Sequence, residues 1–222
     1  MVSPLFITAQ APEASYHKKV YLTFDADMTP FMKRELSSGK IHSWYSPELV
    51  SYLEENNIPA TIFTTGMFAE VYPDVIKKLA ETPGIVIANH TYDHPGFEAP
   101  CYKLKIISSD QEKKNEILKT QEIIKSLVGY EPRYFRYPGL CHNEHDDLLV
   151  KELGLQISVE GIISGDAFTH DAIKIEEHIL ENVHDGSVII MHLGGPHAPA
   201  TDVVVRDIVS KLEKENYVFQ SL

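Results

Sequence analysis

The chain alternates short apolar runs with amphipathic segments. Runs rich in β-branched and aromatic residues predict seven strands, at residues 20–24, 59–65, 84–88, 133–136, 155–159, 187–191 and 217–222. Apolar residues recurring every three or four positions predict helices over residues 46–57, 73–80, 109–129, 143–153, 171–183 and 202–215. Strands separated by helices pair in parallel, so this α/β pattern predicts a distorted, incompletely closed (β/α)7 barrel in preference to an open doubly wound sheet.

Signals at the helix ends support this division. Ser46 followed by Pro47 is typical of a helix start. Ser109 and Glu112 have the spacing of a capping box, and Gly129 is suited to end the same helix.

Three segments lie outside these elements. Residues 1–18 precede the first strand as an N-terminal tail. Residues 31–45 are polar and aromatic without a clear period, which predicts a long loop over the end of the first strand. Residues 90–107 predict a second loop.

Polar side chains gather where the predicted strands end, and in parallel barrels this edge carries the active site. Carboxylates at the end of a buried strand are costly unless they bind a metal, pair with a cation or act in catalysis. The first strand stretch, taken alone, is equally consistent with a capped turn, because Asp also satisfies backbone donors there. The polar residues at or after the strand ends include Asp25, Asp27, His90, His94, Arg136, Asp166 and His192.

His90 and His94 form a His-x-x-x-His pair directly after an apolar strand. Two imidazoles at this spacing can share a metal on a helix turn or a tight loop, and one carboxylate would complete a set that leaves positions for water and substrate. Such histidines are often surface or structural residues, but their place opposite the two aspartates favours a metal site. The expected ion is zinc, and cobalt, manganese or nickel would also suit these ligands.

His192 and Arg136 each have a structural and a functional interpretation. His192 ends an apolar strand, where it could be a structural hydrogen-bonded residue or, beside a metal site, a general acid. Arg136 could orient an aspartate by a bidentate contact or close a surface ion pair. His197, five residues after His192, is expected to be a loop residue.

Composition limits the partners. The chain has 222 residues, 43% of them hydrophobic, which is enough for one domain with a substantial core. The net charge of -12 argues against nucleic acid or an anionic membrane as the main partner. No segment approaches the roughly 20 apolar residues of a membrane helix.

Two further features leave alternatives open. Cys101 and Cys141 are too few for a disulfide scaffold and lack a zinc-thiolate motif, and the sequence does not decide whether they are bridged. The first residues, MVSPLFITAQAPEAS, lack the basic region and long apolar core of a signal peptide. The compartment is therefore open, with a secreted or cell-envelope location slightly favoured over the cytoplasm, and no oligomeric state is predicted.

The ordered series TFDAD, HTYDH, RYP, a later aspartate and IIMH resembles the NodB-homology polysaccharide deacetylase family, carbohydrate esterase family 4. The resemblance covers residues 19–222, which would form one catalytic domain. It implies a distorted (β/α) barrel and a divalent metal. It also implies removal of acetyl groups from N-acetylglucosamine polymers, peptidoglycan or acetylated xylan.

The resemblance assigns a role to each matching residue. Asp25 is similar to the family's catalytic base, which acts on a metal-activated water, and His90 and His94 are similar to its metal ligands. Arg136 matches the arginine that holds the base, and His192 the general acid. The remaining assignments are Asp166 for tuning His192, and Tyr137, Pro138, Gly139, Phe168 and Trp44 for contacts with the substrate.

Three departures from the family pattern bear on these roles. The second aspartate of the usual Thr-Phe-Asp-Asp-Gly is Ala26 here, and we predict that Asp27 supplies the missing metal ligand. An aromatic residue usually follows the proline of the Arg-x-Pro motif, where this chain has Gly139. Beside Asp166 the usual tryptophan is absent, and Phe168 follows instead.

The sequence is consistent with three functions. The expected one is a metal-dependent hydrolase that deacetylates an N-acetylated or O-acetylated carbohydrate, with an N-acetylglucosamine polymer or oligomer as the favoured substrate. The first alternative is a hydrolase of the same fold acting on a non-sugar C–N bond. The second is a non-catalytic carbohydrate-binding module, suggested by Ala26 but opposed by the presence of Asp25 and His192.

Overall fold

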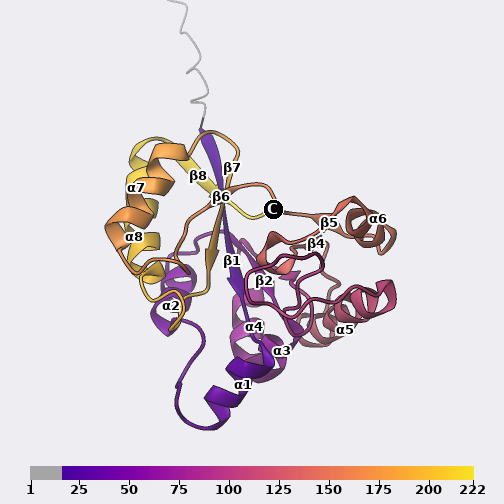
Figure 1. The fold of residues 1–222 in the computed structure, drawn as a ribbon. Helices are drawn as coiled ribbons and strands as arrows, with labels where there is room; N and C mark the ends of the chain where they lie inside the picture. Colours follow the sequence, from indigo (N-terminus) through magenta and orange to yellow (C-terminus); the bar gives the residue numbers. More distant parts are fainter. Residues whose placement is uncertain (1–16) are drawn as a thin grey trace, which may run out of the picture.

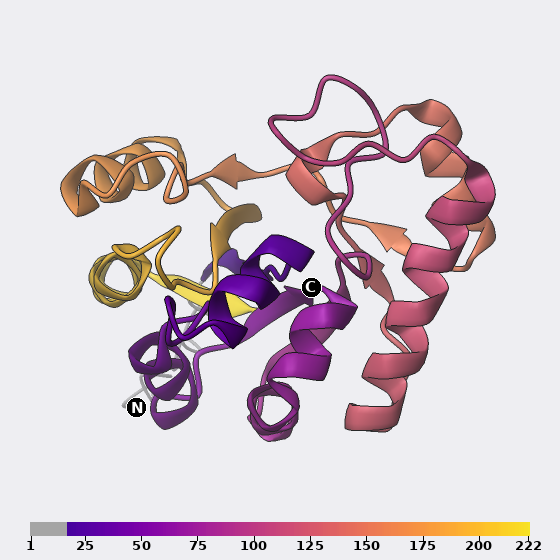
Figure 2. The same cartoon turned by 60° about the horizontal axis from the view of Figure 1, so that its bottom comes forward.

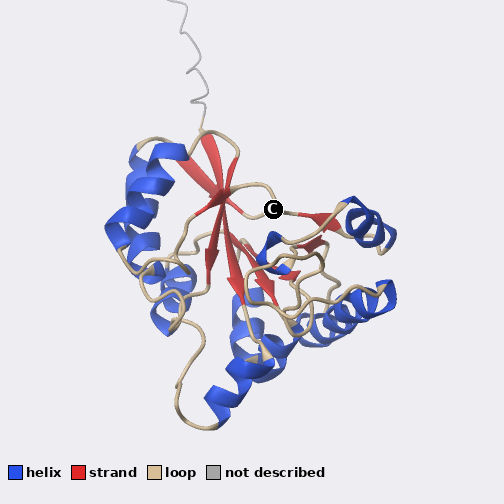
Figure 3. Cartoon of the chain, viewed as in Figure 1, coloured by secondary structure: helices blue, strands red, loops and turns tan. Residues whose placement is uncertain are grey.

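A computed structural model describes residues 17–222 and shows parallel strands curled into a half-barrel with helices outside (Figures 1 and 3). The expected barrel is confirmed. All seven predicted strands form, and a two-residue strand, β6, adds to them. The strands are β1 (Lys18–Ala26), β2 (Ala60–Thr64), β3 (Ile85–Asn89), β4 (Tyr134–Phe135), β5 (Gln156–Ile157), β6 (Ile162–Ile163), β7 (Ser187–His192) and β8 (Tyr217–Gln220).

The sheet has the order β5-β4-β3-β2-β1-β7-β6, and β8 pairs with the first part of β1. Every paired strand runs parallel to its neighbour, so the carboxyl ends of the strands share one edge. Asp25 at the end of β1 lies directly opposite His192 at the end of β7. Strands β5 and β6 are not paired with each other, which leaves the barrel open between them.

Helices cover the outside of the sheet, with α5 and α6 at one side and α7 and α8 at the other (Figure 2). The six predicted helices are present as α2 (Pro47–Glu55), α4 (Pro73–Glu81), α5 (Asp110–Val128), α6 (Glu144–Glu152), α7 (Ala172–Asn182) and α8 (Thr201–Lys214).

Two helices were not expected. Helix α1 (Pro30–Ser37) occupies part of the segment predicted as a loop, because Thr29 caps it and Pro30 has the backbone angle of a first helical residue. Helix α3 (Gly66–Val71) begins after the N-cap Thr65, whose side chain accepts a hydrogen bond from Phe68. Both helices are short, so their apolar period is weak in the sequence.

The predicted helix ends are only partly confirmed. Gly129 ends α5 in the left-handed conformation, as expected. The capping box at Ser109 is wrong, because Ser109 is the N-cap of α5 but its side chain makes no capping hydrogen bond. A complete capping box forms at α6 instead, between Asn143 and Asp146.

The apolar side chains form two clusters. The larger fills the space between the sheet and helices α2, α3, α4, α7 and α8. The smaller lies around β4 and packs Phe97, Phe135 and Tyr137 against residues of α5 and α6. A disulfide joins Cys101 to Cys141, which the sequence had left open, and it ties the loop after β3 to the segment after β4. Both segments border the edge where the strands end.

Candidate active site

Asp25 and Asp27 face the same side of the chain at the end of β1, as expected for residues two apart in a strand. Both are 7% exposed. Ala26 between them belongs to the larger apolar cluster, and its carbonyl accepts hydrogen bonds from Thr65. A carboxylate at position 26 would therefore lie among apolar side chains, whereas the carboxylate of Asp27 faces the histidines at the carboxyl ends of the strands.

Arg136 is completely buried next to Asp25. Its Nη1 donates to Oδ1 of Asp25 at 2.8 Å, and its Nη2 donates to Oγ1 of Thr23 at 2.8 Å. Its Nε donates to the carbonyl of Ser158 at 3.1 Å. The charged group is thus paired and hydrogen-bonded, as a buried guanidinium requires, and the surface ion pair considered for Arg136 is excluded.

His90 and His94 lie on a tight loop after β3. Thr91 and His94 have positive φ angles of 65° and 68°, a strained backbone that turns the second imidazole back toward the first. Helix α5 holds the loop, because Oε2 of Glu116 accepts hydrogen bonds from the backbone N–H groups of Tyr92 and Asp93. The role of Glu116 had no signal in the sequence.

Asp27, His90 and His94 form a three-residue cluster whose ligand atoms converge. Oδ1 of Asp27 lies 3.4 Å from Nε2 of His90 and 3.4 Å from Nε2 of His94. Ligands of a tetrahedral zinc ion at about 2.0–2.1 Å are about 3.3–3.4 Å apart, so this spacing fits such an ion. Oδ1 of Asp27 has no hydrogen-bond partner among the described residues.

The orientation of His90 also suits a metal ligand. Its Nδ1 lies 2.8 Å from the carbonyl oxygen of Arg136. Because a carbonyl only accepts, Nδ1 carries a hydrogen, and Nε2 is the ring nitrogen that faces Asp27. Burial lowers the pKa of His94 to about 4, and the carboxylate of Asp27 offsets this only partly, so His94 is neutral near pH 7.

Asp27 is ionised in this cluster. Burial by itself would raise the pKa of Asp27, but attraction to His94, His90, His192 and His197 outweighs it and lowers the pKa well below its usual range. The donor set is therefore one ionised carboxylate and two imidazoles, which fits a divalent ion.

His192 is held from behind by Asp166. Its Nδ1 lies 2.8 Å from Oδ1 of Asp166, and Oδ2 accepts from the backbone N–H of His192 and from Oγ1 of Thr201. Burial lowers the pKa of His192, but the hydrogen bond and charge of Asp166, with Asp27 and Asp25, raise it to about 9. Its Nε2 points into the site, 3.7 Å from Oδ2 of Asp27.

His197 lies in the loop after β7, as expected from the sequence, and its ring also reaches the site. Its ring packs edge-on against that of His192, with centroids 5.2 Å apart. Burial and the neighbouring charge of His192 lower the pKa of His197 to about 4. Neither ring nitrogen has a hydrogen-bond partner among the described residues.

A cleft of about 240 Å³ opens over Asp25, His94 and His192. Its walls are mainly apolar, and two of its aromatic rings, Tyr102 and Phe168, are each 68% exposed. Their centroids lie 5.7 Å apart. The apolar wall residues are Tyr102, Leu104, Gly139, Leu140, Ile163, Ala167, Phe168 and Ile190.

Gly139 makes room for Tyr102. A Cβ at Gly139 would lie 2.9 Å from Sγ of Cys101 and 3.1 Å from the ring of Tyr102. The disulfide and this close approach thus place the ring of Tyr102 over position 139, on the wall of the cleft.

Three of the predicted substrate contacts are buried in the structure. Tyr137 is completely buried in the smaller apolar cluster, and its hydroxyl contacts Asp147 rather than the cleft. Trp44 is 8% exposed, donates its Nε1 hydrogen to the carbonyl of Met32 and packs near His197. Pro138 is also buried. Gly139 and Phe168, by contrast, line the cleft.

The sequence profile of the family described as "Polysaccharide deacetylase" matches residues 13–158 of the chain. The chain belongs to the polysaccharide deacetylase family. The family expected from the sequence is thereby confirmed, and the matched region includes Asp25, Asp27, His90, His94 and Arg136.

One relative of this member of the family is a peptidoglycan-N-acetylglucosamine deacetylase of Bacillus cereus. It is 31% identical over 179 residues, which cover 80% of this chain and 62% of the relative. The chain therefore spans less than two thirds of the length of that protein.

Solved structures show the same fold. A crystal structure of a peptidoglycan N-acetylglucosamine deacetylase, in complex with 4-naphthalen-1-yl-N-oxidanyl-benzamide, has a TM-score of 0.75 and 29% identity, covering 92% of this chain and 86% of that one. A pseudoenzyme of the same family from Bacillus anthracis has a TM-score of 0.74 and 16% identity, covering 93% and 64%. The family thus contains both deacetylases and at least one pseudoenzyme with this fold.

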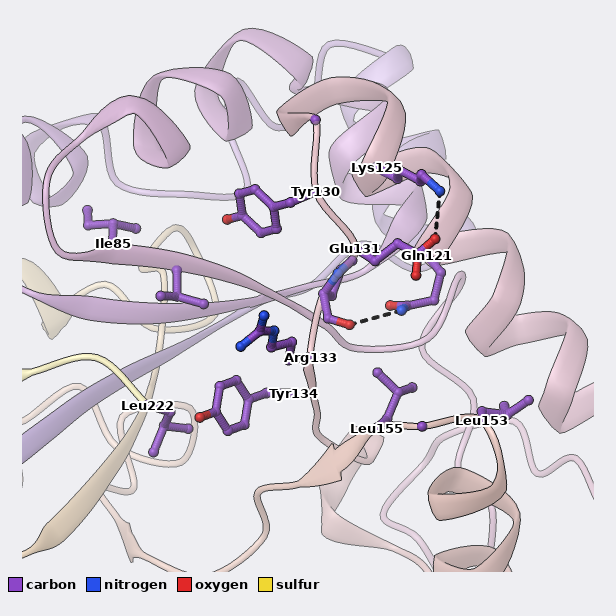
Figure 4. A pocket seen from close by; sticks show the side chains of 14 residues that line it. Ile85, Gln121, Lys125, Tyr130, Glu131, Arg133, Tyr134, Leu153, Leu155 and Leu222 are labelled. Atoms are coloured by element: carbon purple, nitrogen blue, oxygen red, sulfur yellow. Dashed lines mark hydrogen bonds and ion pairs between the residues drawn. The ribbon is translucent and has the colours of Figure 1, made fainter.

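A larger pocket, of about 840 Å³, lies at the end of the barrel opposite to the candidate active site, near the starts of β3, β4 and β5 (Figure 4). Lys125 and Glu131 pair across 2.6 Å there, and Gln121 donates to the carbonyl of Pro132. This pocket contains no converging metal-ligand set, so size alone does not identify the active site.

Proposed function

We propose that the protein is a metal-dependent hydrolase that removes acetyl groups from an N-acetylated carbohydrate. An N-acetylglucosamine-containing polymer or oligomer is the favoured substrate, and O-acetyl groups are a related possibility. The observation that carries the proposal is the convergence of Asp27, His90 and His94, in which Oδ1 of Asp27 lies 3.4 Å from Nε2 of each histidine. Two further side chains, each fixed by a hydrogen-bonded partner, flank this cluster. These groups are Asp25, fixed by Arg136, and His192, fixed by Asp166.

The metal would be a single divalent ion, with zinc expected. Asp27, His90 and His94 would hold it, so that Asp27 takes the place of a ligand at Ala26. When bound, the ion would polarise the acetamide carbonyl and lower the pKa of a water molecule, which makes attack on an amide feasible near neutral pH.

Asp25 is placed to act as the general base. Arg136 occupies its Oδ1 at 2.8 Å, while its Oδ2 lies on the side of the ligand cluster, 3.9 Å from Nε2 of His90. The free oxygen can accept a proton from a water molecule in the cleft. Arg136 keeps this carboxylate oriented, because its buried guanidinium holds Oδ1 by a charge-assisted hydrogen bond.

His192 is placed to act as the general acid. Its Nδ1 hydrogen is committed to Asp166, and its Nε2 lies beside Asp27, facing the cleft. The pKa of His192 is raised to about 9 in the metal-free protein, and the protonated imidazole can give its Nε2 proton to the leaving amine. Asp25 and His192 are register partners on adjacent strands, so acid and base stand side by side.

The cleft supports a carbohydrate substrate. Tyr102 and Phe168 present exposed ring faces beside the ligand cluster, and apolar ring faces are suited to contact the C–H face of a sugar. The relative from Bacillus cereus is itself named a peptidoglycan-N-acetylglucosamine deacetylase.

None of the described helices is long and apolar enough to cross a membrane.

Two alternatives have specific support. A non-sugar C–N bond is favoured by the apolar cleft walls and by the small cleft volume of about 240 Å³. A binding module without activity is favoured by the pseudoenzyme of the same fold. The hydrogen-bonded pairs at Asp25 and His192 oppose the second alternative, because binding a sugar needs neither pair.

The test measures acetate release together with metal content. Purified protein is assayed on N-acetylglucosamine oligomers, on acetylated xylan and on small linear and cyclic amides, before and after chelation and with zinc restored. Chelator-sensitive acetate release from the oligomers is the expected result. Turnover of the small amides alone would favour the first alternative, and stoichiometric zinc without any turnover would favour the binding module.

A His192→Ala variant separates chemistry from metal binding. Because His192 is outside the set formed by Asp27, His90 and His94, the variant should keep the zinc that these three residues hold and lose acetate release. Unchanged turnover would remove His192 from the mechanism.

A further inference from the structure

Asp27 lies between two sets of imidazoles, and only one of them belongs to the proposed metal site. Its Oδ1 faces His90 and His94, whereas its Oδ2 lies 3.7 Å from Nε2 of His192. Ligand atoms of Asp27, His192 and His197 all lie within 4.8 Å of one another, as do those of Asp27, His90 and His94.

We propose that Asp27, His192 and His197 form a second divalent-metal site, and that its occupancy inhibits the enzyme. The carboxylate of Asp27 would bridge the two ions, Oδ1 to the first and Oδ2 to the second. Bridged ions in hydrolases are typically about 3.5–4 Å apart, a separation that one carboxylate can span.

His197 is the observation that points to a ligand here. Both of its ring nitrogens are buried without a hydrogen-bond partner among the described residues. Buried polar atoms are nearly always satisfied, so two such atoms on one ring call for an explanation. Oδ1 of Asp27, one of the proposed ligands of the first ion, shares this property.

The chain fixes His197 in this position. Leu193 accepts a hydrogen bond from the backbone N–H of Ser46 at 2.9 Å. Gly194 and Gly195 follow with positive φ angles of 81° and 84°, and a Cβ on either would lie 2.6–2.7 Å from atoms of Ser46 or Trp44. Only glycine permits this close approach, which leads the chain to His197.

His192 is oriented as metal-bound histidines commonly are. Its Nδ1 contacts the carboxylate of Asp166 at 2.8 Å, which leaves Nε2 for the site. The first site has the same design, with the Arg136 carbonyl behind His90. The 3.7 Å contact in the second site is longer than the 3.4 Å contacts of the first, so the second ion should bind more weakly.

Inhibition follows from the role of Nε2 of His192, and this part rests on the proposed function. A metal ion on Nε2 takes the lone pair that would carry the proton for the leaving amine. Because a positioned acid contributes about 10²–10⁴-fold to such reactions, the second ion should reduce acetate release by about 10²-fold.

The experiment counts bound zinc in the full chain by calorimetry and by elemental analysis, using zinc alone as the probe. The wild-type protein should bind two equivalents, the second more weakly. His197→Ala should bind one. A matched control, His145→Ala, removes an exposed histidine on α6 and should still bind two.

Activity is then followed against free zinc. Wild-type acetate release should rise with the first equivalent and fall with the second, whereas His197→Ala should rise and stay high. His197→Gln provides a second variant of similar size if the alanine variant is poorly folded by circular dichroism. Exchange coupling between two bound Co²⁺ ions, seen by electron paramagnetic resonance in the wild type and lost in the variant, would support the Asp27 bridge.

The outcomes separate this proposal from the proposed function. A wild-type protein that binds one equivalent at millimolar zinc, or a His197→Ala variant that still binds two, would overturn the second site. Two equivalents with acetate release unaffected by the second would overturn the inhibition. Two equivalents without acetate release at any zinc concentration would support the site and refute the deacetylase.

Discussion

Nη1 of Arg136 donates a 2.8 Å hydrogen bond to Oδ1 of Asp25, although the two residues are 111 positions apart in the chain. The guanidinium is completely buried, and the carboxylate is 7% exposed. This pair fixes one oxygen of Asp25 and leaves the other toward the cleft. This hydrogen bond therefore both stabilises the fold and orients Asp25, the proposed base.

Replacing Arg136 by Ala should reduce both activity and stability. Acetate release should fall by about 10²-fold or more, because Asp25 loses its orientation. The free energy of unfolding should drop by about 3–5 kcal/mol, because a buried carboxylate is left without its cation. Zinc content should persist, since His90 contacts only the backbone of Arg136.

Urea unfolding, kcat and elemental analysis check these three expectations. Arg136→Lys keeps the charge without the planar fork that reaches Asp25 and Thr23, so it should restore only part of the stability and activity. A fully active Arg136→Ala variant would contradict the role assigned to this pair.

Asp27 should be required for zinc, and position 26 should not replace it. Asp27→Ala removes the only carboxylate of the proposed trio and should abolish stoichiometric zinc binding. The double variant Asp27→Ala/Ala26→Asp should also fail, because Ala26 packs in the apolar cluster and a carboxylate there would face away from the histidines. Recovery of zinc in the double variant would show that the end of β1 rearranges.

The pKa of His192 should depend on Asp166. In the metal-free protein, NMR titration of the imidazole should give a pKa of about 9. Asp166→Asn removes the main raising contributions, so the pKa of His192 should fall toward its ordinary 6.5. Thr201→Val, which removes the hydroxyl that contacts Asp166 and the carbonyl of Ala198 but keeps the carboxylate of Asp166, should shift the pKa of His192 much less.

The direction of the stability effect follows from this shift. His192 has a folded-state pKa above its unfolded value, so its protonation stabilises the metal-free wild type fully below about pH 6.5, and this contribution is lost as the pH rises through about 9. In Asp166→Asn this pH dependence should disappear. Equal pH dependence in both proteins would contradict the coupling of His192 to Asp166.

Tyr102 should contribute to binding of a carbohydrate. Tyr102→Ala removes an exposed ring from the cleft wall, so KM for N-acetylglucosamine oligomers should rise by roughly tenfold, as expected for about 1.4 kcal/mol of lost ring contact, while kcat changes little. Tyr102→Phe should behave as wild type. Leu148→Ala, which removes another exposed apolar side chain, on α6 and outside the cleft, is the control and should change neither constant.

The sequence by itself determined the barrel and most of its helices. Strand runs and helical periods are local patterns, and each predicted strand and helix is present because the burial of one face decides the element. The short helices α1 and α3 were missed because eight and six residues carry too little period to recognise. Their starts were readable only as caps, at Thr29 and Thr65.

For the site, the sequence indicated its main residues and the edge where they meet. Asp25, Asp27, His90, His94 and His192 all lie at or shortly after the ends of apolar strands, and parallel strands bring their carboxyl ends together. It did not indicate His197, whose position depends on two glycines packed against Ser46 and Trp44.

The tertiary structure alone decided which of these groups touch, which face the cleft and which are buried. Tyr137 and Trp44 looked like substrate contacts but lie inside, whereas Tyr102 is brought to the cleft by a disulfide and a missing side chain at Gly139. Contacts of this kind join residues far apart in the chain. Local periodicity contains no information about them, because side-chain direction and packing partners are set only when the barrel closes around its core.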